Sequence, residues 1–240
     1  MMSMMRLKPG IIGRSAALGP TPSVAAIGAV SSGATATLTP GFPTGIVAGS
    51  LLILHAESSN IAADITTDLA LDGWSEVYDD QRSSGAGNAI RQWVYYKYAT
   101  GSESGSLTVT WAASANRIAR ITRIANARPS APFEGPTLVV GTDDPITGPS
   151  LAPSGANRLG LALIAVGDNQ AASNVLASAT GGTWAGHYGN VEGAGNDTAL
   201  FLNSVDLSAG GSISGGNFSP GMVAAADWLL RGTLVKPTGA

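Results

Sequence analysis

The sequence of 240 residues contains no cysteine. Disulfide bonds, cysteine-ligated zinc and thiol catalysis are therefore excluded. Charged residues are scarce as well, at 12%, and the formal net charge is −3 at pH 7. A nucleic-acid-binding protein usually presents a broadly basic surface, so we expect no nucleic-acid partner.

Long hydrophobic runs are also missing. No apolar stretch approaches the roughly 20 residues of a membrane-spanning helix, so we expect no membrane insertion. The "GII" after "MRLKP" is far shorter than the apolar region of a signal peptide. Hydrophobic residues nevertheless make up 44% of the chain, which is too many for a disordered composition and enough for a sizeable core.

Glycine and proline are abundant, with 32 and 13 copies, and they separate many short apolar segments. "SLTVTW" (106–111) alternates apolar and polar residues, as a half-buried strand does. "SLLILHA" (50–56) and "RLGLALIAV" (158–166) are continuous apolar runs, typical of central strands covered on both faces. "NRIARITRIANA" (116–127) fits one or two helical turns as well as a strand. With no long helix indicated, we expect an all-β fold.

The tetrapeptide "GAGN" occurs twice, starting at Gly85 and at Gly193. Around both copies the same features follow in the same order: an apolar strand, a turn before a tryptophan (Trp74 or Trp184), GAGN, a second strand, a Gly/Ser turn and an apolar closing strand. The agreement predicts two similar halves, about residues 23–127 and 137–235, within a β-sandwich spanning 23–240. We interpret GAGN as a hairpin entry.

The two halves are expected to close over one shared core. A sheet with one apolar face must bury that face against another layer, so we expect the halves to pack face to face as one antiparallel β-sandwich of roughly ten to twelve strands. Two sandwiches in tandem are the alternative. The segment 125–137, with three prolines, is predicted to be the linker between the halves.

Matching the halves also places Arg120 opposite Asp227 in the closing strands. These residues could form an ion pair across the pseudo-twofold or between subunits, but we favour solvated positions at the rim, which contribute under about 1 kcal/mol. Residues 1–22 lack strand or helix periodicity and form an expected extended basic arm for anchoring; a frayed tail is the alternative. The cations of this possible anchor are Arg6, Lys8 and Arg14.

Candidate chemistry is sparse. His55 lies in an apolar strand and His187 in an expected turn, with no carboxylate at ligand spacing. The pairs Asp79–Asp80 and Asp143–Asp144 could serve acid–base hydrolysis of sugars, but we expect them to be structural. The second pair offers too few oxygens for a convincing calcium site. We therefore expect no catalytic residue, metal or cofactor.

One face of the expected strand 90–98 is a candidate contact surface. Its members share an amphipathic character: Arg91, Trp93, Tyr95 and Lys97. Aromatic side chains of this kind can stack sugars or anchor an interface. The alternative is that they pack beneath a loop, as we expect Trp111 and Trp228 to pack in the core.

The pattern "IVAGSLLIL … DGWSEV … WVYYKYATGSESGSLTVTW … RIARITRIANARPSAPFEGP" resembles a class of tailed-phage and prophage virion proteins. These share a "GDLLL"-like strand, a "GW" turn, a "YYK.A…E" stretch and a closing strand that runs into "NP(I/F)D", followed by a second copy of this plan. The similarity covers residues 24–235. Ser50 stands where Asp is usual, and "APFEG" replaces the acidic end of the "NPID" turn.

This resemblance implies a jelly-roll-like sandwich built into a virion and carries no catalytic residues. The expected function is a non-enzymatic structural component of a tailed-phage virion, assembled in the host cytoplasm. A tail-tip or fibre module is favoured over a capsid decoration (cement) protein. Expected partners are other virion proteins, further copies of the chain in a homo-oligomer, and a host cell-surface glycan. A secreted carbohydrate-binding module is the alternative, and an enzyme the third.

Overall fold

The computed structural model consists of β-strands and connecting segments. It describes residues 17–62, 64–85, 89–142, 144–168, 181–192, 198–218 and 226–239, and this part of the chain contains no helix. The strands are β1 (Ser23–Ile27), β2 (Ser31–Gly33), β3 (Thr37–Leu38), β4 (Leu51–Ser58), β5 (Ser75–Arg82), β6 (Ile90–Tyr98), β7 (Val109–Thr110), β8 (Arg117–Ala125), β9 (Phe133–Gly141), β10 (Ile146–Thr147), β11 (Arg158–Val166), β12 (Ala185–Glu192), β13 (Thr198–Leu207), β14 (Asn217–Phe218) and β15 (Trp228–Val235). All their pairings are antiparallel, which confirms the all-β, antiparallel fold class.

The two apolar runs form the central strands β4 and β11, and every residue of both is buried. They therefore lie between covering layers, as the continuous hydrophobicity predicts. The ambiguous segment 116–127 forms strand β8, because it pairs with β4 on one side and with β1 and β2 on the other. Tertiary pairing thus overrides the three-residue spacing of its arginines.

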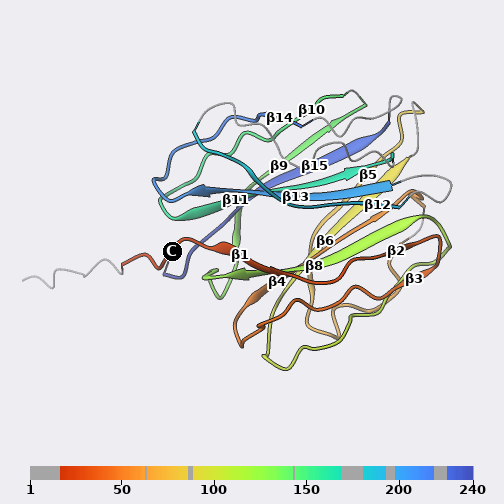
Figure 1. Cartoon of the computed structure of the whole chain (residues 1–240), viewed down its shortest axis with the longest axis horizontal. Coiled ribbons are helices and arrows are strands. Elements are labelled where there is room, and N and C mark those ends of the chain that lie inside the picture. Colours follow the sequence, from red (N-terminus) through yellow and green to blue (C-terminus); the bar gives the residue numbers. More distant parts are fainter. Residues whose placement is uncertain are drawn as a thin grey trace, which may run out of the picture.

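Each half of the chain contributes one main sheet, and the two sheets have the same strand order. The first runs β1-β8-β4-β6-β5, with β2 also paired to β8, and the second runs β9-β15-β11-β13-β12. Each half adds a two-stranded ribbon, β3–β7 or β10–β14. Figure 1 shows the two main sheets stacked on each other, with β10 and β14 outside the second sheet and β3 outside the first.

Three large hydrophobic clusters fill the layers, and a fourth, small cluster joins Ile90, Ala165 and Leu229. The inter-sheet core joins the inner faces of both sheets, with residues such as Leu51, Ile53 and Val94 from the first and Leu161, Leu163 and Leu202 from the second. The first-half outer core lies between the first sheet and its own ribbon and loops, and the second-half outer core lies likewise. The inner faces of the two sheets therefore pack on each other, and the outer face of each sheet is covered by the ribbon and loops of its own half.

Contacts between the two sheets come in reciprocal pairs. β13 lies against β4 and β8, and correspondingly β6 lies against β11 and β15; β12 contacts β8 as β5 contacts β15. The irregular steps match too, since β5 shifts register between Glu76 and Tyr78 and β12 between Gly186 and Tyr188. Such reciprocity is that of a self-complementary interface across a two-fold axis. That the halves superimpose as whole units stays a prediction.

The strand registers correct the expectation that Arg120 and Asp227 occupy equivalent places in the two halves. His55 is paired with Arg120 in the first sheet, and Leu163, at the same place in the second, is paired with Arg231. Arg120 therefore corresponds to Arg231. Equating Arg120 with Asp227 shifts the alignment of β8 and β15 by four residues. Such an even shift leaves every side chain on the same face of the sheet, so hydrophobic alternation alone cannot detect the error.

The two arginines make matching contacts across the interface. The guanidinium of Arg120 lies 4.9 Å from the ring centre of Tyr188, and that of Arg231 lies 4.5 Å from the ring centre of Tyr78. Each arginine also binds the residue two positions after its tyrosine. Arg120 donates to Asn190 Oδ1 at 2.5 Å, and Arg231 donates to both carboxylate oxygens of Asp80 at 2.5 Å. These contacts tie each half to the other by cation–π and hydrogen-bond interactions.

Asp227 is not a solvated rim residue either. Its carboxylate is fully buried and accepts hydrogen bonds from Arg82 Nε at 2.8 Å and from the Ser84 backbone N–H at 2.9 Å. Because Arg82 belongs to the first half, this ion pair is a further link between halves. A buried carboxylate requires such partners, since an unpaired buried charge is strongly destabilising.

Several element boundaries differ from those expected. The predicted linker 125–137 ends inside strand β9, where Pro136 is tolerated because β9 is an edge strand. The closing strand of the second half is β15, which begins at Trp228. The GAGN copies fall between β5 and β6 and between β12 and β13, but residues 86–88 and 193–197 lie outside the described residues. Their turn conformations stay predictions.

The N-terminal cations Arg6, Lys8 and Arg14 also lie outside the described residues. The described segment begins at residue 17 and packs against the C-terminal segment, where the backbone N–H of Gly19 donates to Thr238 O at 2.8 Å. Figure 1 shows the C-terminus beside the entry to β1. The first described residues therefore lie at the end of the sandwich where the C-terminal segment lies.

Candidate functional site

The expected contact face of β6 lies on the outer side of the first sheet, but a covering layer buries most of it. Trp93 is 1% exposed and packs edge-on to Trp111, with ring centres 6.1 Å apart. It offers no exposed aromatic platform, so the alternative of packing beneath a loop holds. Arg91 binds Asp79 through Nε and an NH2 group at 2.7 and 2.6 Å, and the Tyr95 hydroxyl donates to Glu76 at 2.8 Å.

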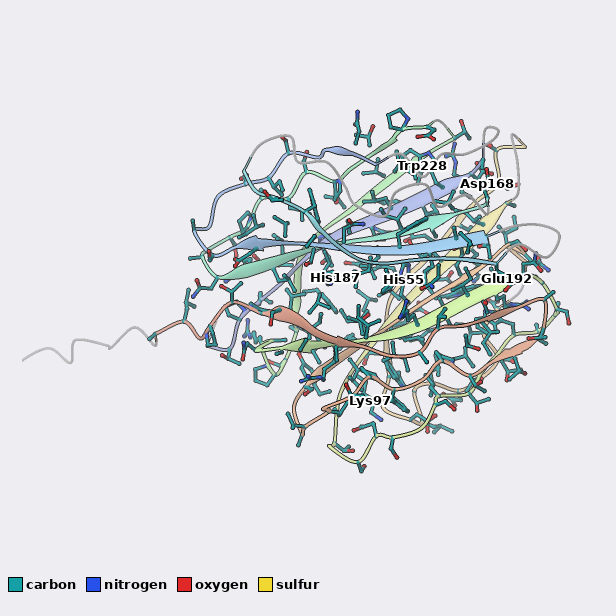
Figure 2. The ribbon with its side chains drawn as sticks, in the orientation of Figure 1. His55, Lys97, Asp168, His187, Glu192 and Trp228 are labelled. Carbon is teal, nitrogen blue, oxygen red and sulfur yellow. The ribbon has the colours of Figure 1, made fainter. Side chains whose placement is uncertain are left out.

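Lys97, the last member of this face, reaches a surface cavity of about 430 Å³. Figure 2 shows Lys97 on the side of the first sheet that faces away from the second sheet. The cavity is bounded by Lys97 on β6, by the turn before β5 and by the loop that leads into β7. Its apolar surface comes from Phe42, Trp74 and Leu107, and its polar surface from Thr67, Asp72, Lys97, Ser102, Glu103, Ser104, Ser106 and Thr108.

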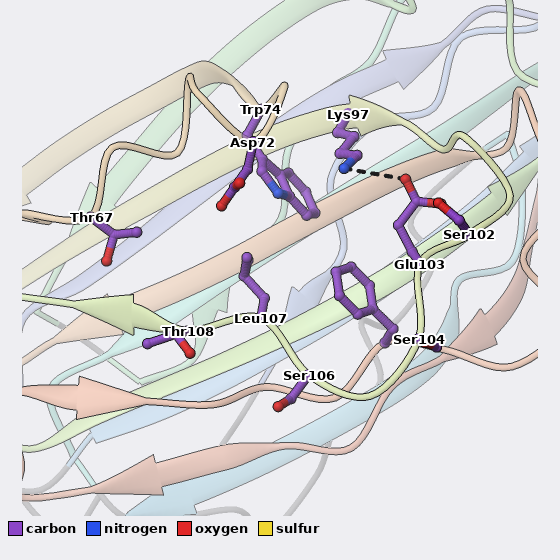
Figure 3. A pocket seen from close by; sticks show the side chains of 11 residues that line it. Thr67, Asp72, Trp74, Lys97, Ser102, Glu103, Ser104, Ser106, Leu107 and Thr108 are labelled. Carbon is purple, nitrogen blue, oxygen red and sulfur yellow. Dashed lines mark ion pairs between the residues drawn. The ribbon is translucent and has the colours of Figure 1, made fainter.

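Two turns place the key side chains of this cavity (Figure 3). Gly73 has φ +79°, a conformation that disfavours residues with a Cβ, and this turn directs Trp74 under the loop while Asp72 stays exposed. The loop after β6 bends at Gly101 and Gly105, both with positive φ. Between these two glycines, Glu103 accepts hydrogen bonds from the backbone N–H groups of Thr100 at 2.9 Å and Gly101 at 3.0 Å.

The ion pair between Lys97 and Glu103 fixes the charge on one side of the cavity. Lys97 Nζ lies 3.2 Å from Glu103 Oε1. Burial acts to raise the pKa of Glu103, but hydrogen bonds from the backbone around Thr100 and from Lys97 outweigh it and bring the pKa down to about 2. Glu103 is therefore ionised at any ordinary pH. Asp72 adds a second carboxylate opposite this pair.

A second polar group lies between the sheets, where Figure 2 places His55. His55 Nδ1 is 3.1 Å from the Tyr188 hydroxyl and Nε2 is 2.7 Å from Gln92 Nε2, which also donates to Leu163 O at 3.2 Å. Burial lowers the pKa of His55 to about 3, so its imidazole is neutral at neutral pH. These contacts are all internal, and the expected structural role of His55 fits them.

Glu57, two residues along β4 from His55, is also fully buried. Burial raises its pKa well above the usual carboxyl range, although the Thr198 hydroxyl donates to Oε1 and opposes the shift. Burial therefore favours the protonated, neutral form of this carboxyl inside the sandwich. The sequence does not show that the Glu57 carboxyl is buried. Glu57 follows an apolar run, and residues on both faces of β4 are buried, so alternation does not distinguish a buried position from an exposed one.

The remaining candidates are in structural positions. Asp79 pairs with Arg91, and Asp80 binds Arg231 of the other half. His187 belongs to strand β12 rather than a turn, and its Nε2 is 2.7 Å from the Ser204 hydroxyl. Asp143 lies outside the described residues. Within the described part of the chain, no three His, Asp or Glu side chains gather as a metal site would require.

Comparison of the chain with protein-family models, with curated proteins and with solved structures yields no significant match. Among the described residues, there is also no helix long and apolar enough to cross a membrane. What is known of the cavity beside Lys97 therefore comes from its own geometry. Sequence reasoning found Lys97 and noted the turn at Trp74, but it missed Asp72 and Glu103, because only the folded loops bring them to Lys97.

Proposed function

We propose that the chain is a non-enzymatic structural component of a tailed-phage virion, working through protein–protein contacts in the tail tip or a fibre. The alternative within the same class is a capsid decoration protein. The motif resemblance described above supports the class of particle. The observation that carries an assembly role is the character of edge strand β9.

β9 ends the second sheet, and no described strand pairs with its outer edge. Its last five residues, 137–141, carry no charged side chain, and Leu138 and Val140 are 43% and 42% exposed. Proteins that remain single usually protect such an edge with charges, prolines, bulges or a covering loop. In β9, Glu134, Pro136 and a register shift lie at the start of the strand, so residues 137–141 are its unprotected part. An uncharged edge with exposed aliphatic side chains suits pairing with a strand of another subunit.

The termini give this assembly a direction. The described chain begins at residue 17 beside the C-terminal segment, so an anchor at that end would leave the opposite end free to face outward. Arg6, Lys8 and Arg14 would bind an acidic surface of a neighbouring virion protein. We propose further copies of the same chain as the partners along β9.

A charge on the edge tests the role of β9. Val140→Lys should leave the melting temperature nearly unchanged, because the side chain is exposed, but it should convert the purified oligomer to monomer in light-scattering measurements. Leu71→Lys is the matched control, since Leu71 is 84% exposed and belongs to the first half, in the turn before β5 rather than in β9. A monomeric wild type, or equal effects of the two variants, would refute the assembly role of β9.

A further inference from the structure

The cavity beside Lys97 has a counterpart in the second half, and the counterpart is filled. Strand registers identify the equivalent positions: Lys97 is paired with Leu52, and Val205 with Gly160, at matching places in the two sheets. Trp74 and Trp184 each immediately precede the matching strands β5 and β12. The cavity beside Lys97 therefore corresponds to the region around Val205 and Gly160 in the second half.

In the second half, apolar side chains occupy this space. The bridge next to the ribbon joins Leu151 to Ile213, where the first half has Gly41 and Ser106. Leu151, Val205 and Ile213 pack with Trp184 in the second-half outer core and are at most 2% exposed. A Cβ at Gly160 would lie 2.6 Å from Val205 Cγ1 and 2.9 Å from Leu151 Cδ1, so this region has no spare volume.

The fold is thus stable with this place closed and apolar, and the open polar cavity in the first half is not needed for packing. A cavity lined by a few polar groups over an apolar surface is the usual form of a small-molecule site. Asp72, Lys97 and Glu103 carry two negative charges against one positive charge, which disfavours anionic ligands. The apolar part of the lining is small, because Trp74 and Leu107 are only 3% and 7% exposed and Phe42 is half-buried, but it can contact the C–H face of a sugar ring.

We propose that this cavity binds a neutral saccharide. The carboxylates of Asp72 and Glu103 accept hydrogen bonds from sugar hydroxyls, and the Lys97 ammonium donates to a ring or hydroxyl oxygen while it holds Glu103 in place. Serine and threonine hydroxyls around the rim complete the polar contacts. The site is distinct from the buried Trp93 and from edge β9. It does not depend on the virion role.

The test uses the full chain and a panel of named sugars. Methyl α-D-glucoside, methyl α-D-mannoside, methyl β-D-galactoside and N-acetylglucosamine are the neutral probes, and N-acetylneuraminic acid is the anionic comparator. Binding is followed by titration in NMR spectra of labelled protein, with the Trp74 indole N–H signal identified through Trp74→Phe. We expect at least one neutral probe to shift this signal saturably and N-acetylneuraminic acid to bind at least tenfold more weakly.

Two variants locate the site. Asp72→Asn should weaken sugar binding about tenfold, because a charge-assisted hydrogen bond becomes a neutral one. Because Asp72 is exposed, this substitution should not destabilise the fold. Asp68→Asn is the matched control: it makes the same charge change on the same loop outside the cavity lining and should have no effect. Lys97→Val copies the second half and should abolish binding, with circular dichroism confirming that the fold is kept.

Three results would overturn the proposal. The first is that no neutral probe binds saturably, and the second is that N-acetylneuraminic acid binds more tightly than the neutral probes. The third is that the Asp72→Asn and Asp68→Asn variants have equal affinities for the sugar. None of these results bears on oligomerisation through β9 or on incorporation into particles. The failure of the sugar site and the failure of the virion role are therefore distinguishable.

Discussion

Leu161→Ala is expected to destabilise the whole molecule in one step, because the two halves share the inter-sheet core. Leu161 is fully buried at the centre of β11 and belongs to this core. Strands β13 and β15 hold its backbone from both sides, so the void left by the lost side chain cannot collapse easily. Substitutions of this kind cost about 2–5 kcal/mol, and we expect about 3 kcal/mol here.

For a chain of this size, that loss lowers the melting temperature by roughly 6–12 °C. Differential scanning calorimetry should show one transition in wild type and variant, moved as a whole. Leu71→Ala, at an exposed loop position, should change stability by less than about 0.5 kcal/mol. A variant that melts in two steps, with one half unaffected, would refute the shared core, and so would a loss below about 1 kcal/mol.

Two further predictions follow. Glu57→Gln should stabilise the protein, relative to wild type, increasingly as the pH rises above 4.5, because the carboxyl then ionises in the unfolded wild type but its raised pKa opposes ionisation in the folded state. Urea unfolding from pH 4 to 8 measures the free energies of unfolding of both proteins. A difference between them that does not change with pH would contradict this prediction. Deleting residues 1–16, which removes Arg6, Lys8 and Arg14 but keeps the Gly19–Thr238 contact, should leave melting unchanged and abolish incorporation into particles. A deletion variant incorporated at the wild-type level would show that the arm is not an anchor.

The central strands could be predicted because they are covered on both sides. Covered strands read as continuous apolar runs, and β11 matches its predicted segment residue for residue. The order of the elements in each half was also visible, since turn glycines and tryptophans mark it. Neither feature depends on knowing which strands pair.

Register and covering layers could not be predicted in the same way. Arg120 corresponds to Arg231 rather than Asp227 because the connections before β8 and β15 differ in length, and alternation with a period of two is blind to an even shift. Trp93 alternates with charged residues, but the ribbon β3–β7 and the loops around it bury its face. The sugar cavity depends on the same loops, which explains why the sequence indicated Lys97 without its partners.

The most direct test of the proposed virion role is the protein composition of phage particles purified from cells that express the chain. Quantitative mass spectrometry is expected to find the chain in intact particles at a fixed copy number, low for a tail-tip or fibre module and in the hundreds for a capsid decoration protein. Expression of the chain in the host, together with its absence from purified particles, would contradict the virion role.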